Sequence, residues 1–147
     1  MKTIEKSEPT KIYVAEDGKE FKDEHECAEY EARCAREEQI KSIDHLLYSR
    51  NDMATPLPIG ATDADECVAY RWYKVNSKDD IELFMNVFSP IRSQIIASQF
   101  PAYIYVESHD ELFNNVYYEV LDESINQIQT FLKFFNMRVE IKQEMQD

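Results

Sequence analysis

The chain opens with a polar segment of about ten residues, followed by a short apolar run, a turn and a second extended run. Ile12, Tyr13 and Val14 form the apolar run, and the turn after it contains Gly18, a residue that tolerates positive φ. The extended pattern resumes at residues 20–21. This arrangement predicts a β-hairpin.

A long helix is predicted after the hairpin. Asp23, followed three residues later by Glu26, matches a capping box, and neither proline nor glycine interrupts the stretch that follows. We therefore expect a helix from about Glu24 to Tyr48. Its apolar positions lie near its two ends, whereas residues 36–39 are wholly polar. The pattern indicates a helical arm whose start packs on the hairpin and whose end packs on the rest of the protein.

Residues 51–65 separate this arm from the second half of the chain. Two prolines and a glycine in the segment are incompatible with a helix and indicate a linker. The expected organisation is a hairpin and helical arm over residues 1–50, the linker, and an α/β sandwich domain over residues 66–147.

The second half alternates between the periods of strands and helices. The order is strand, helix, strand, strand, helix, strand, which is the β-α-β-β-α-β succession of ferredoxin-like sandwiches. The fold class is therefore α+β with an antiparallel sheet, and the last strand alternates strictly between apolar and charged residues. The predicted strands are residues 66–75, 101–107, 116–121 and 137–142, with helices capped near Ser77 and near Asp122 or Ser124.

Charge narrows the classes of function. The 147 residues include 16 Lys and Arg against 29 Asp and Glu, which gives a formal charge of −13 and a pI of about 4.6. Proteins that bind nucleic acid neutralise phosphates with basic residues, so direct nucleic-acid binding is not expected. No run of 18 apolar residues and no secretory leader is apparent, and the three cysteines are an odd number. We expect a cytoplasmic protein with free thiols.

The residue types used in catalysis and metal binding are scattered. His25, His45 and His109 lie far apart, although a triad can assemble from distant residues. Cys27 and Cys34 are seven residues apart, a spacing typical of helix packing rather than of zinc ligands. Two glycines in the whole chain leave no glycine-rich phosphate loop. The sequence therefore predicts no enzyme, no metal and no cofactor.

The predicted sheet carries tyrosines on the face without helices. Tyr103, Tyr105 and Tyr117 are expected there, as are the stacking aromatics of RNA-binding sheets. Glu107, Glu119 and Glu140 are expected on the same face and would repel RNA. The alternative is that the N-terminal hairpin and helix cover these tyrosines.

The most informative pattern is the distribution of acids. Residues 16–31 contain eight acids and two lysines, a net charge of −6. Such runs are often simply solvated faces, but an acidic surface can also steer itself to a basic partner. A second group is expected to cluster at one end of the sandwich sheet, with Asp122 and Glu123 at the other end. The candidate partner-binding residues are Glu16, Asp17, Glu20, Glu24 and Glu31 in the first group, and Asp79, Asp80, Asp110 and Glu111 in the second.

Two segments resemble small acidic proteins encoded by phages and prophages of Gram-positive bacteria. The segments are IYVAEDGKEFKDEHECAEYE and AYRWYKVNSKDDIELF. The resemblance implies a class that includes anti-CRISPR and anti-restriction inhibitors, and it carries over no active-site residues. The shared positions are Tyr13, Ala15, Asp17-Gly18, Phe21, Asp23, Glu26-Cys27 and Tyr30-Glu31.

The expected function is therefore inhibition of a bacterial defence nuclease, with a CRISPR effector as the first candidate. The chain would bind the basic DNA-handling surface through acidic residues and exclude DNA. The alternative is a phage interaction or scaffolding module whose long helix dimerises or docks a partner. An exposed apolar strip of Ile40, Ile43 and Leu47 would favour that alternative.

Overall fold

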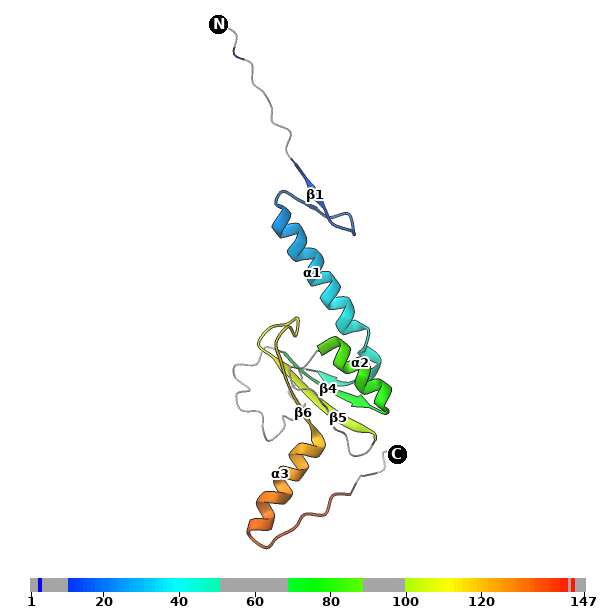
Figure 1. Ribbon diagram of the computed structural model, residues 1–147, viewed down its shortest axis with the longest axis vertical. Helices are drawn as coiled ribbons and strands as arrows, with labels where there is room; N and C mark the ends of the chain where they lie inside the picture. Colours follow the sequence, from blue (N-terminus) through cyan, green and yellow to red (C-terminus); the bar gives the residue numbers. More distant parts are fainter. Residues whose placement is uncertain (1–2, 4–10, 51–68, 89–99, 143, 145–147) are drawn as a thin grey trace. The chain divides into compact units, whose positions relative to one another are not determined.

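The computed structural model describes residue 3 and residues 11–50, 69–88, 100–142 and 144 (Figure 1). The chain divides into two compact units, Met1–Ser42 and Ile43–Asp147. The predicted linker, residues 51–65, lies outside the described residues. Each unit is treated separately below.

The first unit is the predicted hairpin followed by a helix. Strands β1 (Tyr13–Val14) and β2 (Glu20–Phe21) pair antiparallel. The turn between them closes through a hydrogen bond of 2.8 Å from the Gly18 amide to the Ala15 carbonyl, with Gly18 at a φ of 89°. A side chain is strained at this φ, which explains the glycine.

Helix α1 (Glu24–Lys41) begins where the capping pattern predicts. The Asp23 carboxylate accepts hydrogen bonds from the amides of His25, at 2.8 Å, and Glu26, at 3.0 Å. These bonds satisfy amides that have no partner inside the helix.

The expected extension of this helix to Tyr48 is wrong, because α1 ends at Lys41. The Ser42 hydroxyl donates to the Gln39 carbonyl at 2.6 Å and caps the last turn. A short 3-10 helix, η1 (Asp44–Leu46), leads into strand β3 (Leu47–Arg50), whose backbone pairs with the next strand of the sheet. Tertiary pairing therefore overrides the local helical pattern.

The second unit is built on a four-stranded antiparallel sheet in the order β3-β4-β5-β6. The coarse prediction, an α+β fold with a hairpin, a long helix and an antiparallel sheet, is confirmed. The remaining elements are β4 (Ala69–Val75), α2 (Lys78–Phe88), β5 (Ala102–Ser108), β6 (Val116–Val120) and α3 (Leu121–Phe134).

The ferredoxin-like order is not confirmed. Residues 137–142, predicted as the last strand, form no strand and are exposed. The sheet is instead completed by β3, which comes from the segment expected to be helical. In addition, β4 and β5 pair directly and antiparallel although α2 lies between them in the chain. Alternation makes a segment suitable for a strand, but a neighbouring strand must supply its hydrogen bonds.

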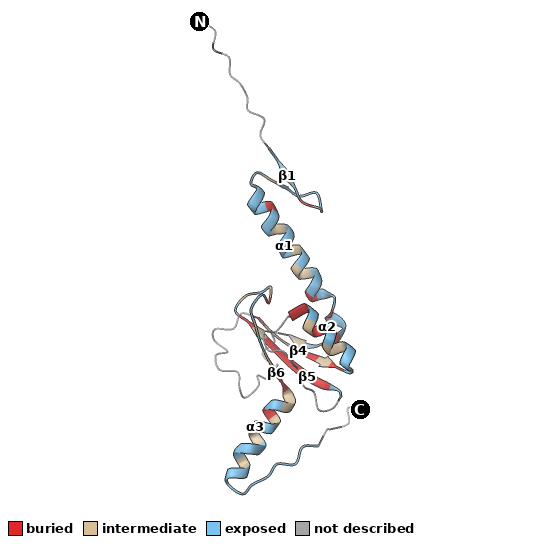
Figure 2. Ribbon diagram, viewed as in Figure 1, coloured by how far each residue is buried: buried red, intermediate tan, exposed pale blue. Residues whose placement is uncertain are grey.

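Helix α2 covers one face of the sheet with aromatic side chains. The Tyr73 ring lies 5.6 Å from those of Phe84 and Phe88, and Phe88 lies 5.8 Å from Phe113. Tyr73, Phe84 and Phe113 are almost fully buried, and Figure 2 shows the buried residues concentrated on the sheet and α2. This aromatic cluster is the core of the second unit.

Candidate functional site

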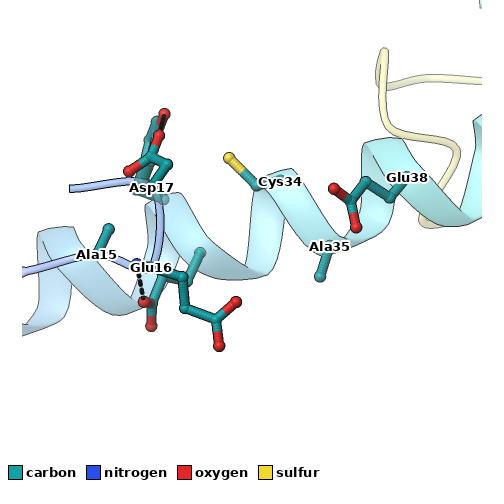
Figure 3. Close-up of a pocket in the computed structure, with 8 residues that line it drawn as sticks. Ala15, Glu16, Asp17, Cys34, Ala35 and Glu38 are labelled. Carbon is teal, nitrogen blue, oxygen red and sulfur yellow. Dashed lines mark hydrogen bonds between the residues drawn. The ribbon is translucent and has the colours of Figure 1, made fainter. Parts of the chain in front are cut away.

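The hairpin turn and α1 enclose a hollow of about 300 Å³ within the first unit (Figure 3). We call it the acidic pocket, because its lining includes four carboxylates and neither lysine nor arginine. It contains three of the predicted partner-binding residues. The lining residues are Ala15, Glu16, Asp17, Tyr30, Glu31, Cys34, Ala35 and Glu38.

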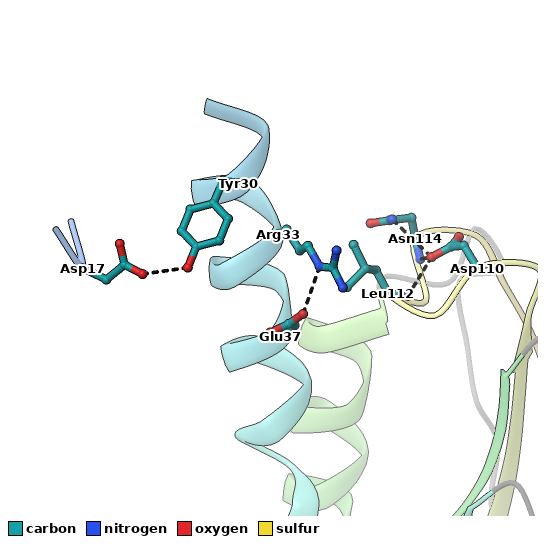
Figure 4. Close-up of polar contacts among 7 residues, drawn as sticks. All are labelled: Asp17, Tyr30, Arg33, Glu37, Asp110, Leu112 and Asn114. Atoms are coloured by element: carbon teal, nitrogen blue, oxygen red, sulfur yellow. Dashed lines mark hydrogen bonds and ion pairs between the residues drawn. The ribbon is translucent and has the colours of Figure 1, made fainter. Parts of the chain in front are cut away.

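Asp17 ties the turn to the helix. Its Oδ2 accepts a hydrogen bond of 2.7 Å from the Tyr30 hydroxyl (Figure 4). Its Oδ1 accepts one of 3.0 Å from the Lys19 amide. The bond from Tyr30, followed by the bond from the Lys19 amide, lowers the pKa of the Asp17 carboxyl. The same contact with Asp17, followed by one with Cys34, raises the pKa of Tyr30. The pKa of Asp17 and the pKa of Tyr30 both move further from neutral pH, so this pair is a structural tie rather than an acid–base couple.

Glu31 makes the second tie between helix and turn. Its Oε1 accepts a hydrogen bond of 3.0 Å from the Glu16 amide. This bond fixes the backbone of Glu16 and leaves the Glu16 side chain exposed beside the pocket (Figure 3). The acidic pocket therefore has a defined wall on the hairpin side.

Lys19 lies close to the acids, but its ammonium is placed over aromatic rings. Its Nζ is 4.1 Å from the centroid of the Tyr30 ring and 5.4 Å from that of Phe21, and these two rings are 5.2 Å apart. A cation over a ring face is attracted by the quadrupole of the ring. The lysine thus packs against the hairpin instead of filling the pocket.

The carboxylates of the pocket can accept hydrogen bonds from cationic groups. Carboxylates bind guanidinium and ammonium groups through short, charge-assisted hydrogen bonds. Burial, followed by the charges of Glu31 and Asp17, raises the pKa of the nearby Cys27 thiol, which disfavours a nucleophilic thiolate. Over residues 11–50, 69–88 and 100–142, no group of three His, Cys, Asp or Glu is arranged to hold a metal ion.

The other predicted acids of the first unit lie outside the pocket lining. Glu20 is on β2 and Glu24 is the first residue of α1, and both are exposed. All eight acids of residues 16–31 are in fact exposed. The hairpin and the first half of α1 therefore carry the negative surface that the sequence predicts.

The expected clustering of the second group is wrong. Val75, at the end of β4 from which α2 and Asp79 follow, pairs with Ala102, whereas Ser108, which precedes Asp110, pairs with Ala69 at the start of β4. The two ends of this strand are roughly 20 Å apart at ~3.3 Å per residue. Asp79 and Asp80 thus lie at one end of the sheet and Asp110 and Glu111 at the other. The cause is the antiparallel pairing of β4 and β5, where the ferredoxin-like order would make these two strands parallel.

Asp122 and Glu123 also lie at the end opposite to the one expected. They follow Val120, which pairs with Ile104 near the start of β5, so they share the end of the sheet occupied by Asp79. The sheet therefore gathers no group of the predicted composition.

Two acids of the second group have structural partners. The Asp80 carboxylate accepts from the Asn76 amide at 2.7 Å, and the Asp80 amide donates to the Ser77 hydroxyl at 3.2 Å, which caps α2. The Oδ1 of Asp110 accepts from the amides of Leu112, at 2.9 Å, and Asn114, at 3.2 Å (Figure 4). Their carboxylates shape local backbone, which leaves less acceptor capacity for a partner.

The register confirms that Tyr105 and Tyr117 share one face of the sheet, but the expectation that this face is free of helices is wrong, because Ser124 of α3 reaches Glu119 there. Tyr105 pairs with Glu119 and Glu107 with Tyr117 across β5 and β6, on the face opposite to α2. Within each strand the tyrosine donates to the glutamate, at 2.6 Å for Tyr105 and Glu107 and at 3.1 Å for Tyr117 and Glu119. Glu119 also accepts from the Ser124 hydroxyl. Because Tyr105 is fully buried and both rings are tied to carboxylates, this face is a poor stacking platform.

The sequence pattern did not assign Tyr30, Cys34 and Glu38 to a binding site. Tyr30 and Cys34 were expected only to pack at helical spacing, and Glu38 continues that spacing by four residues. Residues 30, 34 and 38 follow one another at intervals of four along the same side of the helix. Including Glu38 with Tyr30 and Cys34 would have identified this side of the pocket.

No protein-family model, curated protein or solved structure matches the chain. Among the described helices, none is both long and apolar enough to cross a membrane.

Proposed function

We propose that the chain is a non-enzymatic, phage-type inhibitor of a bacterial defence nuclease, with a CRISPR effector as the first candidate. It acts in the cytoplasm of the bacterial host by occupying the basic surface through which the nuclease handles DNA. The observation that carries this proposal is the acidic pocket, whose lining presents four carboxylates without a basic residue.

The physical basis is competition with DNA for a basic groove. A surface with excess carboxylates is attracted to lysines and arginines over a Debye length of ~8 to 10 Å at physiological ionic strength. At contact, arginine fits carboxylates through two parallel hydrogen bonds. DNA is then excluded because the same basic groups cannot hold its phosphates.

The first unit is the better candidate for this contact. Its acids are exposed over a continuous run of sequence, and the hairpin is fixed to α1 by the Asp17–Tyr30 and Glu16–Glu31 hydrogen bonds. A rigid surface loses less conformational entropy on binding than a flexible one does. The acids of the second unit are divided between two ends of a sheet.

The test is a DNA-cleavage assay with candidate nucleases, across a salt series from ~0.05 to ~0.3 M. The decisive variant is Glu16→Lys with Glu38→Lys, because both residues line the pocket and neither side chain makes a hydrogen bond among the described residues. The matched control is Asp79→Lys with Glu111→Lys, which changes net charge equally on exposed positions of the second unit.

We expect the pocket variant to lose inhibition by at least ~10-fold and the control to retain it. Equal loss in both variants would mean that only net charge matters. Inhibition that does not weaken as the salt concentration rises would argue against electrostatic steering. The proposal would be refuted if the wild-type chain inhibits none of the candidate nucleases.

The alternative function, an interaction or scaffolding module whose long helix dimerises or docks a partner, would be favoured by an exposed strip of Ile40, Ile43 and Leu47. Ile40 and Ile43 are buried, with 5% and 1% of their surface exposed, and Leu47 is half-buried. The strip therefore gives the alternative no support, and Ile43 and Leu47 lie beyond the end of α1.

A further inference from the structure

A group of exposed aromatic side chains lies on the last turns of α3, in the second unit. Phe131, Phe134 and Phe135 are 66%, 83% and 54% exposed. Their rings form one contiguous group, since Phe135 lies 5.4 Å from Phe131 and 5.1 Å from Phe134. At about 200 Å² per aromatic side chain, the exposed area is roughly 400 Å², which is large for a monomer surface and typical of an interaction site.

The segment that follows α3 also exposes apolar side chains. Met137, Val139 and Ile141 are 60%, 41% and 52% exposed. Asn136, at a φ of 57°, ends the helix, and the Met137 amide donates to the Leu132 carbonyl at 3.0 Å. This left-handed cap fixes the direction in which the apolar segment leaves α3.

The charges of this region balance, although the whole chain is strongly acidic. Residues 121–142 are neutral overall, because Lys133, Arg138 and Lys142 balance Asp122, Glu123 and Glu140, whereas the whole chain carries −13. Two copies of so acidic a protein repel one another at most contact surfaces. The balanced charge of the α3 region therefore permits two copies to meet there without strong local repulsion.

The order of charges along α3 also selects an orientation. Glu123 is exposed in the first turn, and Lys133 and Arg138 are exposed at and beyond the last turn. An antiparallel pair of α3 helices places the acidic end of each copy beside the basic end of the other. A parallel pair would place like charges together.

We propose that α3 and residues 135–141 form a two-fold symmetric interface with a second copy of this chain, with antiparallel α3 helices and the three phenylalanines at its centre. The phenylalanines together with the apolar segment cover roughly 1,200 Å² over two copies, at the lower end of specific interfaces. The interface is isologous, as is usual in homodimers.

The test is the mass of the full chain in solution, measured by light scattering and analytical ultracentrifugation from ~1 to ~500 μM. We expect a concentration-dependent dimer of twice 17.4 kDa. Phe134→Asp should raise the dimer dissociation constant by about 30-fold or more, as for a central aromatic anchor. The matched control, Ile12→Asp, alters an apolar residue of the first unit that is 54% exposed and should leave the constant unchanged.

A charge exchange tests the orientation. Glu123→Lys alone should weaken the dimer several-fold, and Glu123→Lys combined with Lys133→Glu should restore it. A wild-type chain that stays monomeric at every concentration overturns the proposal and leaves α3 to a different protein. A monomer whose 137–142 amides resist hydrogen exchange overturns it in favour of pairing within the chain, and equal effects of Phe134→Asp and Ile12→Asp overturn the assigned surface.

Discussion

Two helices of the second unit have similar amphipathic patterns and opposite environments. In α2, Phe84 and Phe88 are buried against the sheet, with 0% and 5% of their surface exposed. In α3, Phe131 and Phe134 are 66% and 83% exposed. Both helices follow a strand of the same sheet, so neither composition nor place in the chain accounts for the difference.

The comparison shows that an amphipathic face indicates a need for a partner without indicating where the partner is. Helix α2 lies along the sheet, where Tyr73 and Phe113 complete its packing. Helix α3 touches β5 and β6, and its start is held through Ser124, which is buried and donates to Glu119. Its later turns carry phenylalanines that the described part of the chain leaves exposed (Figure 2).

The largest expected effect is on α2, the better packed of the two helices. Phe84→Ala removes a fully buried ring and should lower the free energy of unfolding by about 3–5 kcal/mol, the usual cost of such a cavity. Phe134→Ala, on α3, should change it by less than about 0.5 kcal/mol at ~1 μM protein, where a weak dimer dissociates. The measurement is urea unfolding followed by circular dichroism.

Equal destabilisation by the two substitutions at this low concentration would contradict the comparison. It would mean that the Phe134 ring is packed within the single chain. A cost for Phe134→Ala that appears only at high concentration would instead support the dimer.

Helix α1 is a third case, because its partner is the hairpin and a polar contact joins the two. The Asp17–Tyr30 bond lowers the pKa of Asp17 below its ordinary value of 3.8, so the folded state favours the carboxylate. The stabilising contribution is therefore present above pH 3.8 and is lost as the pH falls through the lower folded pKa. We expect the protection of the Gly18 and Lys19 amides, measured relative to their intrinsic exchange rates, to fall in that range.

Tyr30→Phe should accelerate the same amides already at neutral pH, because it removes the donor to Asp17. Tyr13→Phe is the matched control, since Tyr13 lies in the same hairpin and its hydroxyl has no hydrogen bond in the described part of the chain. If Tyr30→Phe behaves like this control, the hairpin is held by ring packing alone.

Much of the fold could be predicted from sequence where a local signal and its partner lie close together. The Gly18 turn, the Asp23 cap and the Ser77 cap are all present because each depends on residues within a few positions. The errors concern long-range pairing. Residues 47–50 join the sheet and residues 137–142 do not, although the latter have the clearer alternation.

The candidate site divides in the same way. Glu16, Asp17 and Glu31 are brought together by a hairpin and the helix that follows it, which sequence proximity made foreseeable. Asp79 and Asp110 were grouped on the assumption of parallel β4 and β5, and the observed antiparallel pairing separates them. The position of a charged residue on a sheet depends on strand direction, which the local pattern does not contain.

The smallest expected effect is a pKa shift at Tyr117, close to Glu119, which accepts a hydrogen bond from Ser124 at the start of α3. Burial, followed by the charge of Glu119, raises the pKa of Tyr117 to about 12 from an ordinary value of 10.0. The neutral hydroxyl therefore stabilises the fold below pH 10, and this contribution is lost as the pH rises towards 12. Tyrosinate absorbance of wild type minus Tyr117→Phe should show one group titrating near 12, and Ser124→Ala should shift it because the Glu119 carboxylate loses a donor. A Tyr117 that titrates at its ordinary value would mean that its hydroxyl is neither buried nor close to the Glu119 carboxylate, which would then accept from Ser124 without Tyr117.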